Sequence, residues 1–236
     1  MPNYKLTVEY DGSDFVGWQA QENGNSIQKS LEISLNKLCN EKINVYGAGR
    51  TDSGVHAEGQ VAHFKISKEI PTDNIRDGAN KYLRPLSIAV LEVEKVSENF
   101  HARFSAKKRV YEYKIINRKA PLTIQKNKAW IIHKHLDFHK MKEASIFFEG
   151  KHDFNAFRSI NCQSNSSIKT IDQCSLIKEK NLISLIVSAK SFLHSQVRIM
   201  VGTLANVGEG KIQPFDLNKI IEMKDRNKAG VTAPAH

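Results

Sequence analysis

Apolar residues in the first half of the chain follow strand-like and helix-like periods in turn. Positions alternating with a period of two predict strands, and positions spaced three and four apart predict helices packed on one face. We expect strands at Tyr4, Leu6, Val8 and Tyr10 (ending at Asp11-Gly12), around Ile43 and Val45, at Ala62, Phe64 and Ile66, and over residues 88–96. We expect helices along Ile27, Leu31, Leu35 and Leu38 (Asn25 as N-cap, with Gln28 three positions on) and along Ile75, Ala79 and Leu83 (Thr72 as N-cap). The resulting order β-α-β-β-α-β is that of a split βαβ, ferredoxin-like sandwich.

The second half begins with a similar order of elements. Expected strands contain Tyr111, Tyr113 and Ile115 and cover residues 129–132, 170–177 and 182–188. Expected helices contain Met141, Ala144 and Phe148 (capped by Asp137, with Gly150 just past the end), then Val197, Val201 and Leu204, and finally residues 216–223. Sequence similarity between the halves is not visible, so a duplication is inferred from element order alone.

These patterns predict an α+β fold made of two ferredoxin-like (split βαβ) α/β sandwich halves, whose antiparallel sheets flank a central cleft. We expect an N-terminal α/β domain at residues 1–105 and a C-terminal α/β domain at residues 106–236. Clefts between such domains commonly hold ligands. The terminal residues 229–236 have the composition of a loop that leads into another element, so the second domain is expected to lack a final strand.

Composition excludes several classes. Hydrophobic residues at 40% and charged residues at 25% are ordinary for a globular protein, and there is neither an apolar run of membrane-spanning length nor a signal peptide, so we expect a cytoplasmic protein. Cys39, Cys162 and Cys174 show no C-x-x-C spacing, so free thiols are expected. A histidine cluster (His133, His135, His139) has no carboxylate or cysteine at a familiar ligand spacing, so no metal site is expected.

The charge favours a polyanionic partner. Lys and Arg number 35 against 25 Asp and Glu, a formal net charge of +10. Basic surfaces attract and steer nucleic acids, although solvated lysine faces are common on proteins that bind none. The lysines are dispersed rather than gathered in a tail, which favours a folded groove over a tethering arm.

The densest candidate for chemistry is the glycine-rich segment at residues 47–57, which joins two predicted strands. Its glycines permit positive φ and close approach of another backbone. A phosphate-binding P-loop does not fit, because no G-K-[ST] and no helix follow. An ordinary hairpin turn is the structural alternative, but a turn does not need Arg50, Asp52 and His56. An arginine within reach of Asp52 would lower the pKa of that carboxylate and hold it ionised for attack.

Two further segments combine aromatic and basic residues. Residues 100–106 and 109–113 interleave rings with Arg and Lys, as suits stacking on bases and contact with phosphates; the alternative is that Tyr111 and Tyr113 are core residues of a strand. Residues 192–204 form an amphipathic core helix in which His194 and Arg198 stand one turn apart. A surface salt bridge is the alternative role for Arg198.

Together these segments resemble the tRNA pseudouridine synthase A family. The most specific match is G-R-T-D-S-G-V-H-A at residues 49–57. The other matching motifs follow in register, at residues 8–12, 15–19, 100–105, 109–113, 152–154, 192–202 and 229–236. The resemblance covers the chain from residue 8 to residue 236, and the family continues past A-P-A-H into a last strand.

The resemblance implies an isomerase that converts uridine to pseudouridine at positions 38, 39 and 40 of the tRNA anticodon stem-loop. It implies no metal and no organic cofactor, and a homodimer bridged by tRNA. By matching positions, Asp52 is the nucleophile, Tyr111 the tyrosine stacked on the target base, Arg50 the arginine that pairs with the aspartate and displaces the base, and Arg198 an arginine lining the active cleft.

Three points stay open at this level. Asp52 can attack the sugar or the base, or assist loss of the C2′ proton; Tyr111 offers both a flat face and a phenol OH for proton transfer. The alternative functions are a non-catalytic tRNA-binding or chaperone protein and a metal-dependent nuclease. The first would not need Arg50, Asp52 and Tyr111 together, and the second needs carboxylates clustered near Asp52 that the sequence does not show.

Overall fold

The computed structural model describes residues 1–21 and 24–235. The chain divides into two compact units, Met1–Ala106 and Lys107–Pro234, and each has its own buried core. The expected α+β class with two α/β halves is confirmed. None of the helices in the described ranges is long and apolar enough to cross a membrane.

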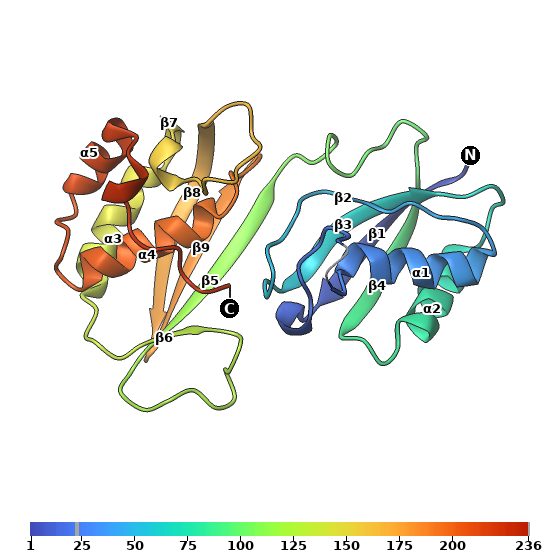
Figure 1. Cartoon of the computed structure of the whole chain (residues 1–236), viewed down its shortest axis with the longest axis horizontal. Coiled ribbons are helices and arrows are strands. Elements are labelled where there is room, and N and C mark those ends of the chain that lie inside the picture. Colours follow the sequence, from blue (N-terminus) through green and yellow to red (C-terminus); the bar gives the residue numbers. More distant parts are fainter. Residues whose placement is uncertain (22–23, 236) are drawn as a thin grey trace. The chain divides into compact units, whose positions relative to one another are not determined.

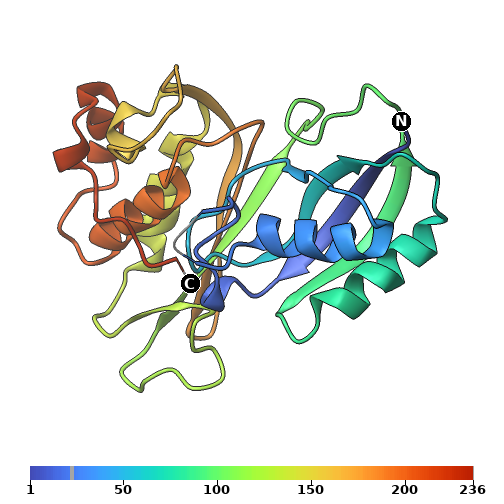
Figure 2. The same cartoon turned by 45° about the vertical axis from the view of Figure 1, so that its right-hand side comes forward.

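The first unit is a four-stranded antiparallel sheet with two helices on one face (Figures 1 and 2). Its strand order, β2-β3-β1-β4, is that of the ferredoxin-like sandwich. The elements are β1 (Asn3–Tyr10), a 3-10 helix (Gly12–Asp14), α1 (Ile27–Cys39), β2 (Tyr46–Gly47), β3 (Ala57–Lys65), α2 (Thr72–Leu83) and β4 (Ile88–Val96).

The predicted apolar stripes form this unit's core. Leu31 and Leu35 of α1 and Ile75 of α2 are fully buried against β1, whose alternate residues from Tyr4 to Tyr10 all face inward. Burying one such aliphatic side chain contributes roughly 1.5–3 kcal/mol. The two helices also meet directly, since Ser34 Oγ donates to the Ala79 carbonyl at 2.8 Å.

Three local predictions for this unit are wrong. Ser26, not Asn25, caps α1, because the Ser26 hydroxyl accepts from the Lys29 amide. Pro71, not Thr72, holds the N-cap position of α2, and Thr72 is its first helical residue. Ile43 and Val45 are buried but precede the strand, which pairs only at Tyr46 and Gly47. Alternating buried residues give the apolar pattern of a strand even where the backbone makes no hydrogen bonds to a neighbouring strand.

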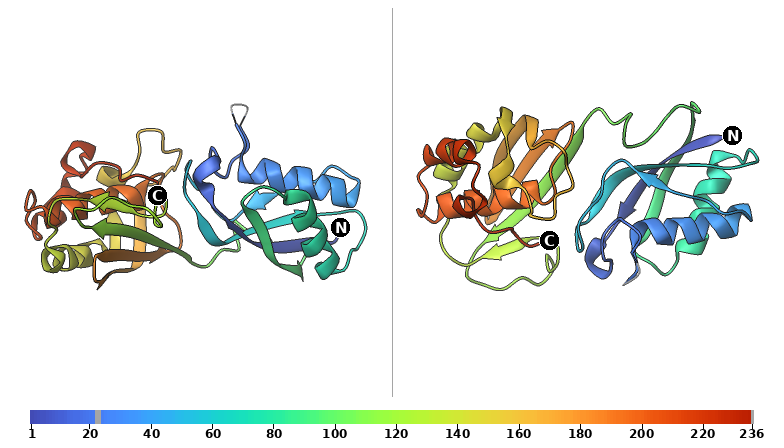
Figure 3. Two further views of the ribbon diagram at one scale, coloured as in Figure 1. Left: turned by 90° about the horizontal axis from the view of Figure 1, so that it is seen from below. Right: turned by 45° about the horizontal axis from the view of Figure 1, so that its top comes forward.

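The second unit is a five-stranded sheet in the order β6-β5-β9-β8-β7, with helices packed on it (Figures 1 and 3). Its elements are β5 (Arg109–Asn117), β6 (Trp130–Ile132), α3 (Phe138–Ser145), β7 (Gly150–Asp153), β8 (Ile168–Glu179), β9 (Leu182–Ala189), α4 (Gln196–Gly208) and α5 (Asp216–Met223). Short 3-10 helices lie at Ile146–Phe148, Asn155–Phe157 and Arg226–Lys228.

Order and direction in this sheet differ partly from expectation. β5, β9 and β8 repeat the positions of β1, β3 and β2 in the first unit. Beside β5, however, β6 runs parallel to it, so this sheet is mixed rather than antiparallel. Strand β7 was not expected at all. Gly150 has φ +96°, so it ends the preceding helical turn as predicted and starts a strand that pairs with β8.

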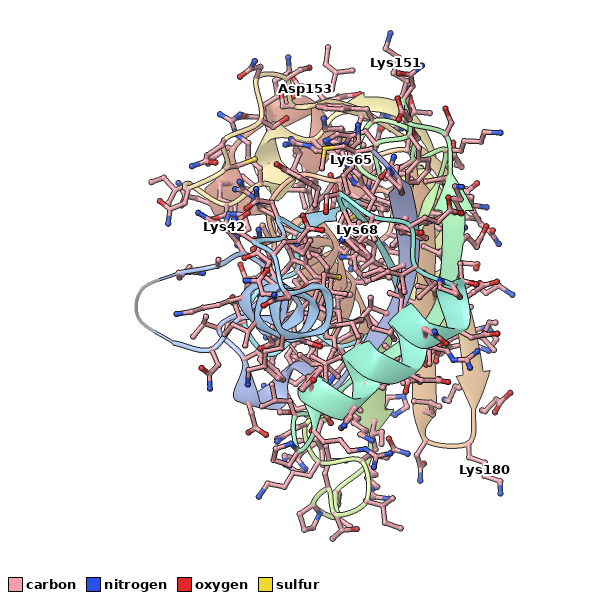
Figure 4. The ribbon with its side chains drawn as sticks, turned by 90° about the vertical axis from the view of Figure 1, so that its right-hand side faces the viewer. Lys42, Lys65, Lys68, Lys151, Asp153 and Lys180 are labelled. Carbon is pink, nitrogen blue, oxygen red and sulfur yellow. The ribbon has the colours of Figure 1, made fainter. Side chains whose placement is uncertain are left out.

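The β8–β9 hairpin was predicted at nearly its observed bounds. Lys180 turns the chain with φ +54°, and its exposed side chain points away from the hairpin tip (Figure 4). Asp137 caps α3 as expected, accepting from the Lys140 amide at 3.1 Å. Residues 230–235 follow the last 3-10 helix as an irregular segment; the terminal motif also includes His236, which lies outside the described residues.

Candidate functional site

The glycine-rich segment is a loop that leaves β2 and returns to β3 in the first unit. Its first two residues, Ala48 and Gly49, are hydrogen-bonded to β3. The Ala48 amide donates to the Val61 carbonyl at 2.7 Å, and Gln60 Nε2 donates to the Gly49 carbonyl at 3.0 Å. The hydrogen bonding between β2 and β3 therefore continues into the start of the loop.

The chain that follows β1 supports the middle of the loop. The Trp18 amide donates to the Thr51 carbonyl at 3.1 Å, and Tyr10 shares a 2.9 Å hydrogen bond with the Thr51 hydroxyl. On the other side of Asp52, Ser53 Oγ donates to the Phe15 carbonyl at 3.1 Å. Both neighbours of Asp52 are thus tied to buried aromatic residues or their backbone.

Gly17 permits this contact. Its φ is +109°, and a Cβ there would lie 2.6 Å from the Thr51 carbonyl oxygen and 3.1 Å from the Asp52 carbonyl carbon. No L side chain fits such an approach without moving one of the two backbones. The absence of a side chain at Gly17 thus allows the backbone around it to pack directly against the backbone of residues 51–53.

Asp52 itself is half-buried, while Arg50 is exposed two residues earlier on the same loop. The Asp52 carbonyl accepts from the Val55 amide at 3.2 Å, which closes a turn through Gly54 at φ +81°. The backbone that carries the carboxylate is therefore fixed by hydrogen bonds at Thr51, at Ser53 and at the Asp52 carbonyl itself. Such fixed placement is what a nucleophile or base requires.

His56 holds the far end of the loop. Its Nδ1 lies 3.0 Å from the Gly12 amide and 3.1 Å from an Asp11 carboxylate oxygen. One nitrogen cannot serve both partners at once: unprotonated Nδ1 accepts from Gly12, and protonated Nδ1 donates to Asp11. Either contact ties the loop to the same chain segment that holds Thr51.

In the second unit, Tyr111 and Tyr113 lie on β5, two positions apart. Tyr111 is half-buried, and its ring meets Phe192 edge-on at a centroid distance of 5.1 Å. Tyr113 is buried and its OH donates to the Pro234 carbonyl at 2.8 Å. Burial raises the pKa of Tyr113 far above its usual value, and the nearby charge of Arg198 opposes that rise. Tyr113 is thus a core residue, whereas Tyr111 keeps an accessible part.

Arg198 projects from α4 toward the terminal segment. Its Nε donates to the Ala233 carbonyl at 2.7 Å, and the Ala233 amide donates to the Arg198 carbonyl at 3.1 Å. The side chain is half-buried there. This hydrogen bond to a backbone carbonyl differs from the surface salt bridge considered from the sequence.

Asp52 and Arg50 belong to the first unit, and Tyr111 and Arg198 belong to the second. The sequence patterns alone do not identify the residues that hold the loop: Tyr10, Gly17, Trp18 and His56. The pair Gly17-Trp18 could have indicated them, because a glycine next to a tryptophan that is buried suggests that another backbone packs closely there. Among the described residues, no group of three or more His, Cys, Asp or Glu side chains is placed to hold a metal ion.

Comparison with known proteins agrees across the chain. A family model described as tRNA pseudouridine synthase matches residues 6–105 and 144–236. The chain is 48% identical over 234 residues to tRNA pseudouridine synthase A of Parvibaculum lavamentivorans, covering 99% of this chain and 95% of that protein. It is 50% identical over 234 residues to the protein of that name in Ehrlichia chaffeensis, covering 99% and 96%, and 49% identical over 235 residues to that in Anaplasma phagocytophilum, covering 99% and 96%.

Proposed function

The chain belongs to the tRNA pseudouridine synthase family, and we propose that it modifies uridines at positions 38, 39 and 40 of the anticodon stem-loop. The family activity is an isomerisation of uridine to pseudouridine in tRNA. The proposal adds the site on the tRNA and the residues that act there. In it, residues 1–105 form the domain of the Asp52 loop, and residues 106–236 form the domain of Tyr111 and Arg198.

The reaction moves one glycosidic bond without changing the atoms of the nucleotide. The C1′–N1 bond breaks, the uracil turns, and C1′ bonds to C5; the C5 proton leaves to solvent and N1 gains one. No oxidant, reductant or second substrate is required. The proposal therefore includes neither a metal nor an organic cofactor.

Asp52 is the proposed nucleophile. The observation that supports it most directly is the loop itself, whose backbone is hydrogen-bonded on both sides of Asp52 and backed by Gly17. Attack at the sugar, attack at the base and assisted loss of the C2′ proton all use this carboxylate. They differ only in the atom that it meets.

Arg50 is the proposed partner of Asp52 and the group that displaces the base. A target uridine must leave the helical stack before it reacts, which costs a few kcal/mol. A guanidinium is planar and can stack in the vacated space. Arg50 is exposed and lies two residues before Asp52 on the same loop. Its side chain can therefore extend toward RNA from a backbone whose position relative to Asp52 is fixed.

Tyr111 and Arg198 are the proposed contributions of the second domain. The edge-on contact with Phe192 fixes the Tyr111 ring, as a platform for the detached uracil requires. Its phenol OH is the proposed proton shuttle. Arg198 is proposed to line the cleft, with its Nε bond to Ala233 orienting the guanidinium.

The formal charge of +10 supports binding of a large polyanion. We further propose a homodimer acting on tRNA in the cytoplasm. The test is release of tritium from tRNA labelled at uridine C5, with and without EDTA. EDTA-insensitive release by wild type, abolished by Asp52→Asn with tRNA affinity kept within a few-fold, is the expected result. Asp172→Asn, at an exposed carboxylate of β8, is the matched control.

Position is tested with tRNAs in which uridines 38, 39 and 40 are replaced by cytidine singly and together. Release that persists when all three are replaced would refute the proposed site while leaving the family activity in place. Binding without release would indicate the non-catalytic alternative, and EDTA-sensitive strand cleavage the nuclease. Asp52→Asn retaining more than a few per cent of turnover would remove Asp52 as nucleophile.

A further inference from the structure

Four rings form a continuous aromatic row on the first unit, which we call the aromatic platform: Tyr46, His63, His101 and Phe104. Tyr46 stacks on His63 at 5.2 Å between ring centroids and 29° between planes. His63 lies 4.6 Å from His101, and His101 lies 4.4 Å from Phe104 at 38°. The row connects β2 and β3 with residues 101–104, which follow β4.

Hydrogen bonds fix the platform in place. His63 Nδ1 lies 3.2 Å from the Ala102 amide and 3.3 Å from the Tyr46 carbonyl. Burial, followed by the charges of His101 and Lys65, lowers the pKa of His63, outweighing the Tyr46 carbonyl, which raises it. Nδ1 cannot serve both partners at once: without a proton it accepts from the Ala102 amide, and with one it donates to the Tyr46 carbonyl, so His63 is held to a platform neighbour in either case.

The turn that presents Phe104 is itself closed. The Ser105 amide donates to the His101 carbonyl at 2.8 Å, and the His101 amide donates to Ser105 Oγ at 3.1 Å. His101 Nδ1 accepts from the Arg103 amide at 3.2 Å. Phe104 thus extends from a rigid turn that is anchored to β3 through Ala102.

The two terminal rings of the platform are exposed to solvent, although hydrogen bonds fix the residues between them. Phe104 is 76% exposed and Tyr46 is 49% exposed. Exposed rings held in an ordered row leave aromatic surface available for stacking, which a buried core ring does not. The Arg103 guanidinium lies 6.0 Å from the centre of the Phe104 ring, and Lys65 ends β3 two residues after His63 (Figure 4).

We propose that the aromatic platform is a second tRNA-binding surface, on which an unpaired nucleobase other than the reacting uridine stacks against Phe104. Unstacked RNA bases bind to aromatic faces, and a neighbouring guanidinium suits the phosphate beside them. Arg103 and Lys65 favour RNA over a second copy of this basic chain. The inference rests on tRNA being the substrate, not on which of its uridines reacts.

The aromatic platform and the proposed nucleophile are carried by the same β2–β3 hairpin. Tyr46 belongs to β2, and the Asp52 loop begins directly after β2. A base held at Phe104 would therefore fix the tRNA relative to Asp52 through a single hairpin. Its effect is expected in binding, because Phe104 does not reach the reacting atoms in this assignment.

The test uses Phe104→Leu and Phe104→Trp, with Phe215→Leu as the matched control. Phe215 is 57% exposed and has the Lys219 ammonium 5.0 Å from its ring centre, so it reproduces an exposed phenylalanine beside a cation. Phe104→Leu is expected to weaken tRNA binding about 5- to 150-fold, as loss of one base stack predicts. Phe104→Trp and Phe215→Leu are expected to bind within about twofold of wild type.

Three controls separate the proposal from its alternatives. The melting temperature and oligomeric state of Phe104→Leu should equal those of wild type, and its single-turnover tritium release at saturating tRNA should fall less than its tRNA affinity. The proposal is overturned by equal affinity of Phe104→Leu and wild type, by equal losses in the Leu and Trp variants, or by an altered oligomeric state. Absence of tritium release from wild type would instead count against the proposed function, since binding is measured independently.

Discussion

Gly202 and Gly230 cross with their backbones in contact. A Cβ on Gly230 would lie 2.4 Å from the Gly202 carbonyl carbon, and a Cβ on Gly202 would lie 1.9 Å from the Val231 carbonyl oxygen. The Gly230 amide donates to the hydroxyl of Thr203 at 2.8 Å. The segment after Lys228, red in Figures 1 and 3, can therefore cross α4 and bring Ala233 to Arg198.

Gly202→Ala is expected to destabilise the protein by about 1–3 kcal/mol, as overpacking at a closed contact does. Helix propensity alone predicts the opposite sign, because alanine is favoured over glycine by about 1 kcal/mol inside a helix. Gly78→Ala in α2 is the matched control, since its new Cβ meets only the movable tip of Leu38. Urea denaturation measures both. A Gly202→Ala protein as stable as Gly78→Ala would contradict the crossing.

Gly17→Ala is expected to impair catalysis more than binding. The substitution is strained at φ +109° and pushes on the Thr51 carbonyl, so it displaces the backbone that holds Asp52. Misplacement of a reacting group by about 1 Å can cost about 10²-fold in rate. Single-turnover rate and tRNA affinity are the measurements. Gly59→Ala, whose Cβ would meet only Thr7 at 3.8 Å, should leave both unchanged.

Tyr111→Phe and Tyr111→Leu separate the two proposed roles of this tyrosine. If the phenol transfers a proton, the Phe variant loses at least about a hundredfold in single-turnover rate at nearly unchanged affinity. If the ring only stacks, Phe is close to wild type and Leu is clearly slower. We expect the first pattern. A purely structural tyrosine would instead lower the melting temperature in both variants, with activity following the folded fraction.

tRNA affinity is expected to fall steeply with salt, with log K linear in log salt concentration, because bound phosphates release counterions. Arg103→Gln should reduce the slope by about one counterion, whereas Phe104→Leu should lower affinity at unchanged slope. Filter binding at several potassium chloride concentrations measures both quantities. A flat response in wild type would show that the +10 charge does not serve RNA binding.

Periodicity predicted the parts of the fold in which apolar faces pack on a core. Leu31, Leu35 and Ile75 lie inside as expected, and β4 and α5 have their predicted bounds. Caps were less predictable, since Asn25 and Ser26 are both good N-cap residues and only the backbone decides between them. Strand β7 has just four residues, with no buried residue to give it an apolar pattern.

The candidate site shows the same division. Motif residues located the Asp52 loop, because the loop is continuous in sequence. Its supports were not assigned, since the bonds from Trp18 and Tyr10 to Thr51 join residues more than thirty positions apart. The platform was equally hidden: residues 100–106 were noted for their rings, but His63 and Tyr46 join them only through the β2–β3 pairing.

Among the described residues, the two buried clusters have no member in common: one ends with Val93 and the other begins with Tyr113. The proposed catalytic groups are divided between these clusters. Because each cluster is packed within its own half, we expect each half to have its own melting transition, and the loss of either half to abolish turnover. The inactivation temperature should therefore equal the melting temperature of the less stable half. A ligand that stabilises only the more stable half should leave the inactivation temperature unchanged.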